Sequence, residues 1–259
     1  MRPIGAPPKW SGDTTIMDSH PAAQTEPIKQ DGGLQARPFV PYEHPPRLDL
    51  DAPTSTGSIH IMTQYNICVY CGSGCGRNPI YVDAARRLGE DLAEADIGLV
   101  YGGGSLGLMG EVAKATLAAG GRVTGIIPDF LVQRERMLTD VNELVVTANM
   151  HERKMSMFER ADGFVALPGG MGTLEELVEI STWAQLGRHN KPIILANIDN
   201  YWDPFLSLLE HMREQQFIRA GLEVHIEVVK GAEEIVPAFH DRLKKQIPAT
   251  PVRPPHRTL

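Results

Sequence analysis

FVALPGGMGTLEELVE, residues 164–179, joins an apolar run to a glycine-rich turn and then to an amphipathic segment. The run FVALP has the near-continuous apolar character of a strand that is buried on both faces of a sheet. The segment that begins at Leu174 has its apolar residues at helical spacing. A strand, a glycine turn and a helix in this order are typical of one unit of a parallel α/β sheet.

The same alternation extends in both directions, from residue 65 to residue 246. Strands are expected at 67–71, 97–101, 123–127, 144–147, 164–167, 193–197 and 224–229. Helices are expected at 80–95, 108–119, 152–161, 174–186, 204–216 and 232–246. The pattern predicts a single α/β domain with a doubly wound, Rossmann-like parallel sheet and helices on both faces. Such sheets bind ligands beyond the carboxyl ends of their strands.

The composition is that of an ordinary globular protein. Of the 259 residues, 42% are hydrophobic and 22% are charged, which excludes collagen-like, coiled-coil and wholly disordered chains. The formal net charge of −7 disfavours a nucleic-acid partner, because such proteins usually present a basic face. No apolar run approaches the roughly 20 residues that span a bilayer, so no membrane partner is expected.

Proline marks the two ends of the chain. Ten of the 20 prolines fall in residues 1–64 and four more follow residue 247. We therefore expect a Pro-rich disordered extension over 1–64, the Rossmann-like domain over 65–247 and a Pro-rich tail over 248–259. The extension lacks the basic and apolar regions of a signal peptide.

The three cysteines are Cys68, Cys71 and Cys75. They are too few and too close together for the disulfide framework of a secreted protein, so a cytoplasmic location is expected. Their C-x2-C-x3-C spacing raises the alternative of a metal or iron–sulfur site. Two of them fall in a strand and no fourth ligand is near, so we interpret them as small buried hydrophobes and expect no metal.

Three glycine-rich turns follow strands: CGSGCG at 71–76, YGGGSLG at 101–107 and LPGGMGT at 167–173. Glycine removes the Cβ that would block a phosphate, and the helix that follows offers free amides. Glycine also makes tight turns that bind nothing, but three such turns on one sheet edge favour a nucleotide site. The G-x-G-x-x-G spacing of the second turn is a weak sign of NAD, because it follows the second strand and the nearest acid, Asp129, stands behind Pro128.

Charged residues flank two of the expected helices. Arg153 and Lys154 stand at the start of one helix, where cations oppose the helix dipole, so they indicate anion binding unless the face is merely solvated. Glu176 lies three residues after Thr173, on the same helix face. Acids in a first helical turn also stabilise the dipole without any ligand. We expect Leu174, Leu177 and Val178 to pack on the sheet.

LPGGMGTLEELVE, MHERK, YGGGSLGLMG and TWAQLG together resemble the Lonely Guy (LOG) family, also called "lysine decarboxylase-like". The P-G-G-x-G-T-x-x-E pattern is matched at 168–176, and the resemblance covers about residues 65–245. It implies a phosphoribohydrolase that cleaves the N-glycosidic bond of an N6-modified adenosine 5′-monophosphate, releasing an active cytokinin base and ribose 5-phosphate. It also implies a homodimer or a larger homo-oligomer, and no cofactor.

The resemblance marks Arg153 and Glu176 as catalytic. The substrate-binding residues that it implies are Glu135, Arg153, Lys154, Gly170, Met171, Gly172, Thr173, Leu174, Glu175, Glu176 and Thr182. Additional loop contacts are expected from Gly72, Ser73, Gly103 and Gly104.

These roles agree with the chemistry of the residues. Cleavage at C1′ develops oxocarbenium character, which the Glu176 carboxylate can stabilise while it positions water. The amides of 170–173 would hold the 5′-phosphate, and Arg153 would orient Glu176. A general AMP nucleosidase is an alternative with the same chemistry. A non-catalytic carrier of a nucleotide or of molybdenum cofactor is another, against which the presence of both Arg153 and Glu176 argues. Lysine decarboxylation is disfavoured, because no pyridoxal-phosphate lysine environment is recognisable.

Overall fold

The computed structural model describes residues 64–132, 136–218 and 224–246. Within these ranges seven parallel strands form one sheet in the order β4-β3-β2-β1-β5-β6-β7. The strands are β1 (Asn66–Tyr70), β2 (Gly98–Tyr101), β3 (Val123–Pro128), β4 (Glu143–Thr147), β5 (Gly163–Ala166), β6 (Ile193–Ala196) and β7 (Ile226–Val229). The predicted doubly wound α/β sheet is confirmed. The expected extension and tail, apart from residue 64, lie outside the described residues.

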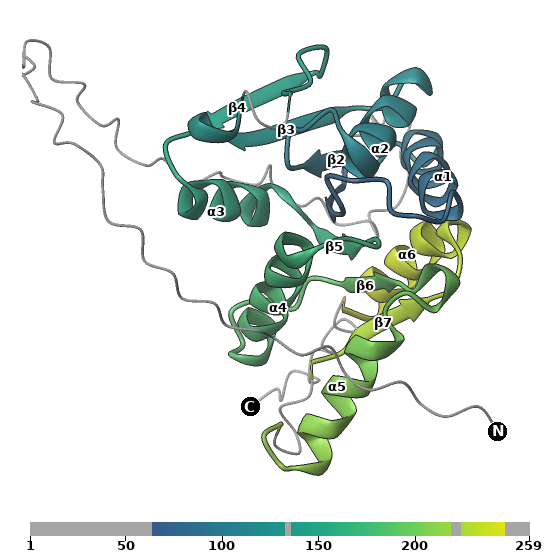
Figure 1. Cartoon of the computed structure of the whole chain (residues 1–259), viewed down its shortest axis with the longest axis vertical. Coiled ribbons are helices and arrows are strands. Elements are labelled where there is room, and N and C mark those ends of the chain that lie inside the picture. The colour runs from purple at the N-terminus through teal and green to yellow at the C-terminus, as the bar shows by residue number, and fades with distance from the viewer. Residues whose placement is uncertain (1–63, 133–135, 219–223, 247–259) are drawn as a thin grey trace, which may run out of the picture. The chain divides into compact units, whose positions relative to one another are not determined.

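Helices cover both faces of the sheet (Figure 1). One face packs against α1 (Ile80–Glu94), α2 (Gly107–Ala118) and α6 (Ile235–Gln246). The other packs against α3 (Met150–Arg160), α4 (Met171–Gln185) and α5 (Asp203–Glu214). Strand β1 shows why both are needed: Ile67 and Val69 belong to the first core, and Cys68 and Tyr70 to the second. Successive side chains of a strand point to opposite faces, so an apolar strand must be covered twice.

The chain changes direction across the sheet between β1 and β5. Strands β2, β3 and β4 extend to one side of β1, and β5, β6 and β7 extend to the other. The loops after β1 and β5 therefore leave the same edge and meet, with Gly72 N donating to Pro168 O at 3.1 Å. Such a switch point is where open α/β sheets bind ligands. The first and third glycine turns lie here.

Helix α4 differs from its expected form in two respects. It begins at Met171 instead of Leu174, so the last three residues of the glycine turn, Met171, Gly172 and Thr173, lie in its first turn. Val178 does not pack on the sheet: 45% of it is exposed. The buried side of α4 is set by Thr173, Leu177 and Ile180. Val178 comes one residue after Leu177, which rotates it about 100° around the helix and toward solvent.

Two of the three cysteines are buried, as expected for small hydrophobic residues. Cys68 and Cys71 are buried, whereas Cys75 is exposed in the first glycine turn. Burial, reinforced by the negative charge of Glu176, raises the pKa of both buried thiols, which keeps them protonated at neutral pH. Within the described ranges, no three His, Cys, Asp or Glu side chains gather as metal ligands. No described helix is long and apolar enough to cross a membrane.

Candidate active site

The third glycine turn presents the start of α4 to the sheet edge. Gly170 is the N-cap, and the first intrahelical hydrogen bond runs from Leu174 N to Gly170 O at 3.0 Å. The amides of residues 171–173 precede this bond and have no partner within the helix. Met171 and Gly172 are exposed, and a Cβ on Gly170 or Gly172 would meet no described atom within 4 Å. The start of α4 is thus open to an anion.

The back of this turn is tightly packed. A Cβ on Gly169 would lie 2.2 Å from Thr173 Oγ1 and 2.9 Å from Gly72 N, so only glycine fits there. The Tyr201 hydroxyl donates to Gly169 O at 2.5 Å, and its ring meets Tyr81 edge-on at 5.6 Å. These contacts hold the turn in place. Sequence analysis missed Tyr201; the signal was its position just past β6, whose carboxyl end lies at the same sheet edge.

Helix α3 positions the two adjacent cations. Its N-cap is Asn149, whose Oδ1 accepts from Glu152 N at 2.9 Å, while Glu152 Oε2 accepts from Ala148 N at 3.1 Å. This reciprocal cap supplies the negative charge that the dipole requires, so Arg153 and Lys154 are tolerated one turn later. The cap was not identified in the sequence, although Asn149 and Glu152 have the capping spacing.

Arg153 is buried and is held by backbone carbonyls. Its Nε donates to Ile126 O at 3.2 Å, and its Nη2 donates to Gly102 O at 3.4 Å. Its Nη1 lies 4.0 Å from Glu176 Oε1, and the two side chains are only 7% and 12% exposed. Charges at this distance interact more strongly when water is excluded. The structure thus brings together the two residues expected to be catalytic.

Lys154 has partners other than the expected phosphate. Its Nζ contacts Glu175 Oε1 at 2.7 Å and Glu179 Oε1 at 2.9 Å. Burial by itself would lower the pKa of Lys154, but these two hydrogen bonds outweigh it and raise the pKa. In this structure Lys154 links α3 to α4 and remains charged at neutral pH.

The second glycine turn differs from the third because it does not offer an open helix start. The loop contacts expected from Gly103 and Gly104 stay predictions. The first amides of α2 donate to the first turn: Leu108 N to Gly74 O at 3.4 Å and Met109 N to Gly72 O at 3.3 Å. Gly103 and Gly104 are buried. The second turn therefore supports the first one, in which Gly72 is buried and Ser73 is exposed.

The other predicted site residues differ in whether the structure describes them and in how exposed they are. Glu135 lies outside the described residues. Leu174 is half-buried beside the exposed Glu175. Thr182 is exposed on α4, where its hydroxyl donates to Val178 O at 2.8 Å. The substrate contacts assigned to these residues stay predictions.

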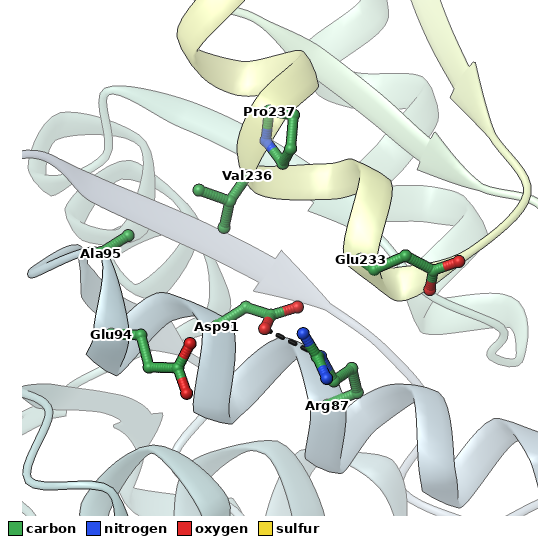
Figure 2. A pocket seen from close by; sticks show the side chains of 7 residues that line it. All are labelled: Arg87, Asp91, Glu94, Ala95, Glu233, Val236 and Pro237. Atoms are coloured by element: carbon green, nitrogen blue, oxygen red, sulfur yellow. Dashed lines mark ion pairs between the residues drawn. The ribbon is translucent and has the colours of Figure 1, made fainter.

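A surface hollow lies away from this site, on the face covered by α1 and α6 (Figure 2). Its lining residues are Arg87, Asp91, Glu94, Ala95, Glu233, Val236 and Pro237. Arg87 Nε pairs with Asp91 Oδ1 at 2.8 Å. Three carboxylates against one guanidinium disfavour a phosphate there, so the edge formed by the first and third turns remains the candidate site.

The sequence and fold have relatives with known names. A family described as "Possible lysine decarboxylase" matches residues 109–239. The cytokinin riboside 5′-monophosphate phosphoribohydrolase LOG of Oryza sativa subsp. japonica is 49% identical over 180 residues, which are 67% of this chain and 74% of the relative. LOG7 of Arabidopsis thaliana, which carries the same enzyme name, is 44% identical over 188 residues, covering 70% of this chain and 87% of the relative.

The chain belongs to the LOG family. Solved structures show that its fold is shared more widely. The Moco carrier protein of Chlamydomonas reinhardtii has a TM-score of 0.53 at 23% identity, covering 70% of this chain and 99% of the carrier. The molybdenum cofactor binding protein of Rippkaea orientalis has a TM-score of 0.53 at 22% identity, with the same coverage. At this identity the likeness concerns the fold, so membership of the LOG family rests on the sequence relatives.

Proposed function

We propose that this LOG-family protein hydrolyses the N-glycosidic bond of adenosine 5′-monophosphates. The C1′–N9 bond of the nucleotide breaks, the oxygen of a water molecule bonds to C1′, and one proton of that water passes to the leaving base, so that free base and ribose 5-phosphate are released. The observation that carries the proposal is the Arg153–Glu176 pair at the open start of α4. The names of the relatives at 44% and 49% identity support the same reaction.

The 5′-phosphate binds at the start of α4. The amides of residues 171–173 and the positive end of the helix dipole favour an anion at that point. Contacts behind the turn hold its amides in position before substrate arrives. Pro168 O accepts from Gly72 N, Thr173 Oγ1 packs against Gly169, and the Tyr201 hydroxyl donates to Gly169 O. A phosphate fixed here places the ribose along the first turns of α4, toward Glu176.

Glu176 stabilises the positive charge that develops at C1′ and accepts a proton from the attacking water. Its carboxylate is 12% exposed, so bulk water screens it little. Arg153 orients this carboxylate through the 4.0 Å contact and keeps it paired in the buried site. A pure carrier of nucleotides has no need of this buried pair.

The relatives are named for cytokinin riboside 5′-monophosphates. We propose that this chain takes the same class of substrate, with N6-isopentenyl-AMP as the representative that carries an apolar N6 group. We expect kcat/KM for N6-isopentenyl-AMP to exceed that for AMP by at least about 10-fold, because burial of the isopentenyl group adds binding energy. Steady-state release of both bases, separated by chromatography, measures the ratio. Equal values would instead assign the chain as a general AMP nucleosidase.

A homodimer is supported by an apolar stripe on α4. Met171 and Val178 on α4 and Leu186 at its C-cap are 80%, 45% and 76% exposed. Their spacing puts them on one side of the helix, opposite Leu177 and Ile180, with the exposed Glu175 and Thr182 between them. An apolar stripe left in water beside a binding site is typical of a protein interface. Two copies related by a twofold axis would pair their stripes.

Charge in this stripe should dissociate the dimer. We expect the double variant Val178→Glu, Leu186→Glu to elute as a monomer of 28.5 kDa in light-scattering chromatography, at concentrations where the unmodified chain has twice that mass. Leu208→Glu is the control, because Leu208 is 47% exposed on α5 and should leave the mass unchanged. A monomeric unmodified chain, or a dimeric double variant, would refute this interface.

A further inference from the structure

The glycine at position 102 makes a contact that the phosphate interpretation of its turn does not explain. Gly102 follows β2 directly and is buried. A Cβ built on it would lie 2.2 Å from Arg153 Nη2 and 3.4 Å from Arg153 Cζ. The carbonyl of the same residue accepts the hydrogen bond from Nη2. The backbone of residue 102 thus touches the guanidinium with both its Cα side and its oxygen.

The backbone itself does not require glycine here. Gly103, the next residue, has a φ of +79°, a conformation that other residues rarely adopt. Gly102 is not among the residues with positive φ. An alanine at 102 is therefore free of backbone strain, and its methyl group meets the flexible end of the Arg153 side chain and Met109 Sδ at 3.1 Å. Glycine at position 102 has no Cβ, and its absence leaves the space that the Arg153 guanidinium occupies.

We propose that Gly102 is a positioning residue: it admits the Arg153 guanidinium to the carbonyls of Gly102 and Ile126, and so aims Nη1 at Glu176. One carbonyl, of Gly102, directly follows β2, and the other, of Ile126, lies within the neighbouring strand β3 of a rigid sheet. They fix two of the three guanidinium nitrogens, leaving Nη1 for Glu176 and Met150 Sδ, which lies 3.8 Å away. The role in catalysis rests on the proposed function; the placement of the guanidinium does not.

The first test is the crystal structure of Gly102→Ala beside that of the unmodified protein. The guanidinium should leave Gly102 O, and the Nη1 to Glu176 distance should increase from 4.0 Å by about 1 Å or more, while the sheet stays in place. A guanidinium that keeps its hydrogen bonds to Gly102 O and Ile126 O in the variant would overturn the proposal. This outcome is independent of any activity.

The second test is kinetic. Gly102→Ala should lower kcat for N6-isopentenyl-AMP about 100-fold with a smaller change in KM, because displacement of a catalytic group by about 1 Å costs roughly that factor. Gly89→Ala is the matched control: its Cβ would lie 2.5 Å from Val112 O between α1 and α2, so it strains the fold away from the site. It should lower the melting temperature and leave kcat unchanged. A Gly102→Ala kcat within threefold of the unmodified value would overturn the catalytic role.

A double-mutant cycle separates positioning from any direct contact of Gly102 with substrate. Arg153→Lys removes the Nη2 atom that the new methyl group would strike. In this background Gly102→Ala should cost less than about threefold in kcat, because coupled residues are not additive. An undiminished 100-fold loss would show that Gly102 acts by another route. If the unmodified protein cleaves neither nucleotide, the proposed function fails, and the crystal structures alone decide the placement of Arg153.

Discussion

Glu176→Gln lowers kcat by about 1000-fold, the loss expected when a positioned general base and its charge are removed. Glutamine preserves the shape of the side chain, but it cannot accept a proton from water or offset positive charge at C1′. KM should change much less, because the phosphate amides at the start of α4 remain. Release of base from N6-isopentenyl-AMP, followed over hours at high enzyme concentration, measures the residual rate.

The control for this variant is Glu179→Gln. Glu179 lies on the same helix and contacts Lys154, which keeps a second carboxylate partner in Glu175. We expect its kcat to stay within about threefold of the unmodified value, because Lys154 keeps Glu175 as a partner and, among the described ion pairs, Glu179 contacts Lys154 and not Arg153. Circular dichroism should be the same for both variants. A Glu176→Gln variant that retains a tenth of the activity would remove Glu176 from the catalytic role.

Arg153→Ala has the second largest expected effect. The change removes the cation 4.0 Å from Glu176 and removes the Nε and Nη2 donors from the carbonyls of Ile126 and Gly102. We expect kcat to fall about 100- to 1000-fold. The free energy of unfolding should fall by about 1–3 kcal/mol, the cost of unpaired buried polar groups. Thermal or urea unfolding and steady-state kinetics measure the two effects separately.

Arg153→Lys distinguishes charge from geometry. Lysine keeps the positive charge but cannot bond to two carbonyls and a carboxylate in one plane. Its kcat should lie between those of Arg153→Ala and the unmodified protein. The control is Arg160→Ala, on the same helix, whose Nη1 pairs with the half-exposed Glu143; it should leave kcat unchanged. An Arg153→Ala variant with normal kcat would show that Glu176 needs no orienting cation.

The elements of the fold could be predicted because each carries a local signal. Apolar runs such as FVALP mark buried strands, and glycine turns end them, so all seven described strands and all six described α-helices lie close to their expected ranges. Boundaries moved where packing decides them, as at Met171, where α4 starts within the glycine turn. The order of strands and helices predicted a doubly wound sheet, but it did not predict the switch point between β1 and β5 or the hydrogen bond from Gly72 to Pro168.

The partners within the site could not be predicted, because they depend on which turns meet in space. The sequence indicates anion binding at Lys154, yet two carboxylates on α4 contact this residue in the structure. The second turn resembled a cradle, yet the amides of Leu108 and Met109 bond to the first turn. The 3.6-residue period shows that α4 has an apolar side, but only the packed structure shows that Val178 lies outside it. Each of these contacts joins residues far apart in the sequence.

The reaction itself is tested most directly by measuring both products from one nucleotide. Purified protein incubated with N6-isopentenyl-AMP should release the free base and ribose 5-phosphate in equal amounts, and the release should stop in the Glu176→Gln variant. Chromatography quantifies the base, and mass spectrometry quantifies the sugar phosphate. Failure to release base from either N6-isopentenyl-AMP or AMP, by a folded protein with Arg153 and Glu176 intact, would contradict the account.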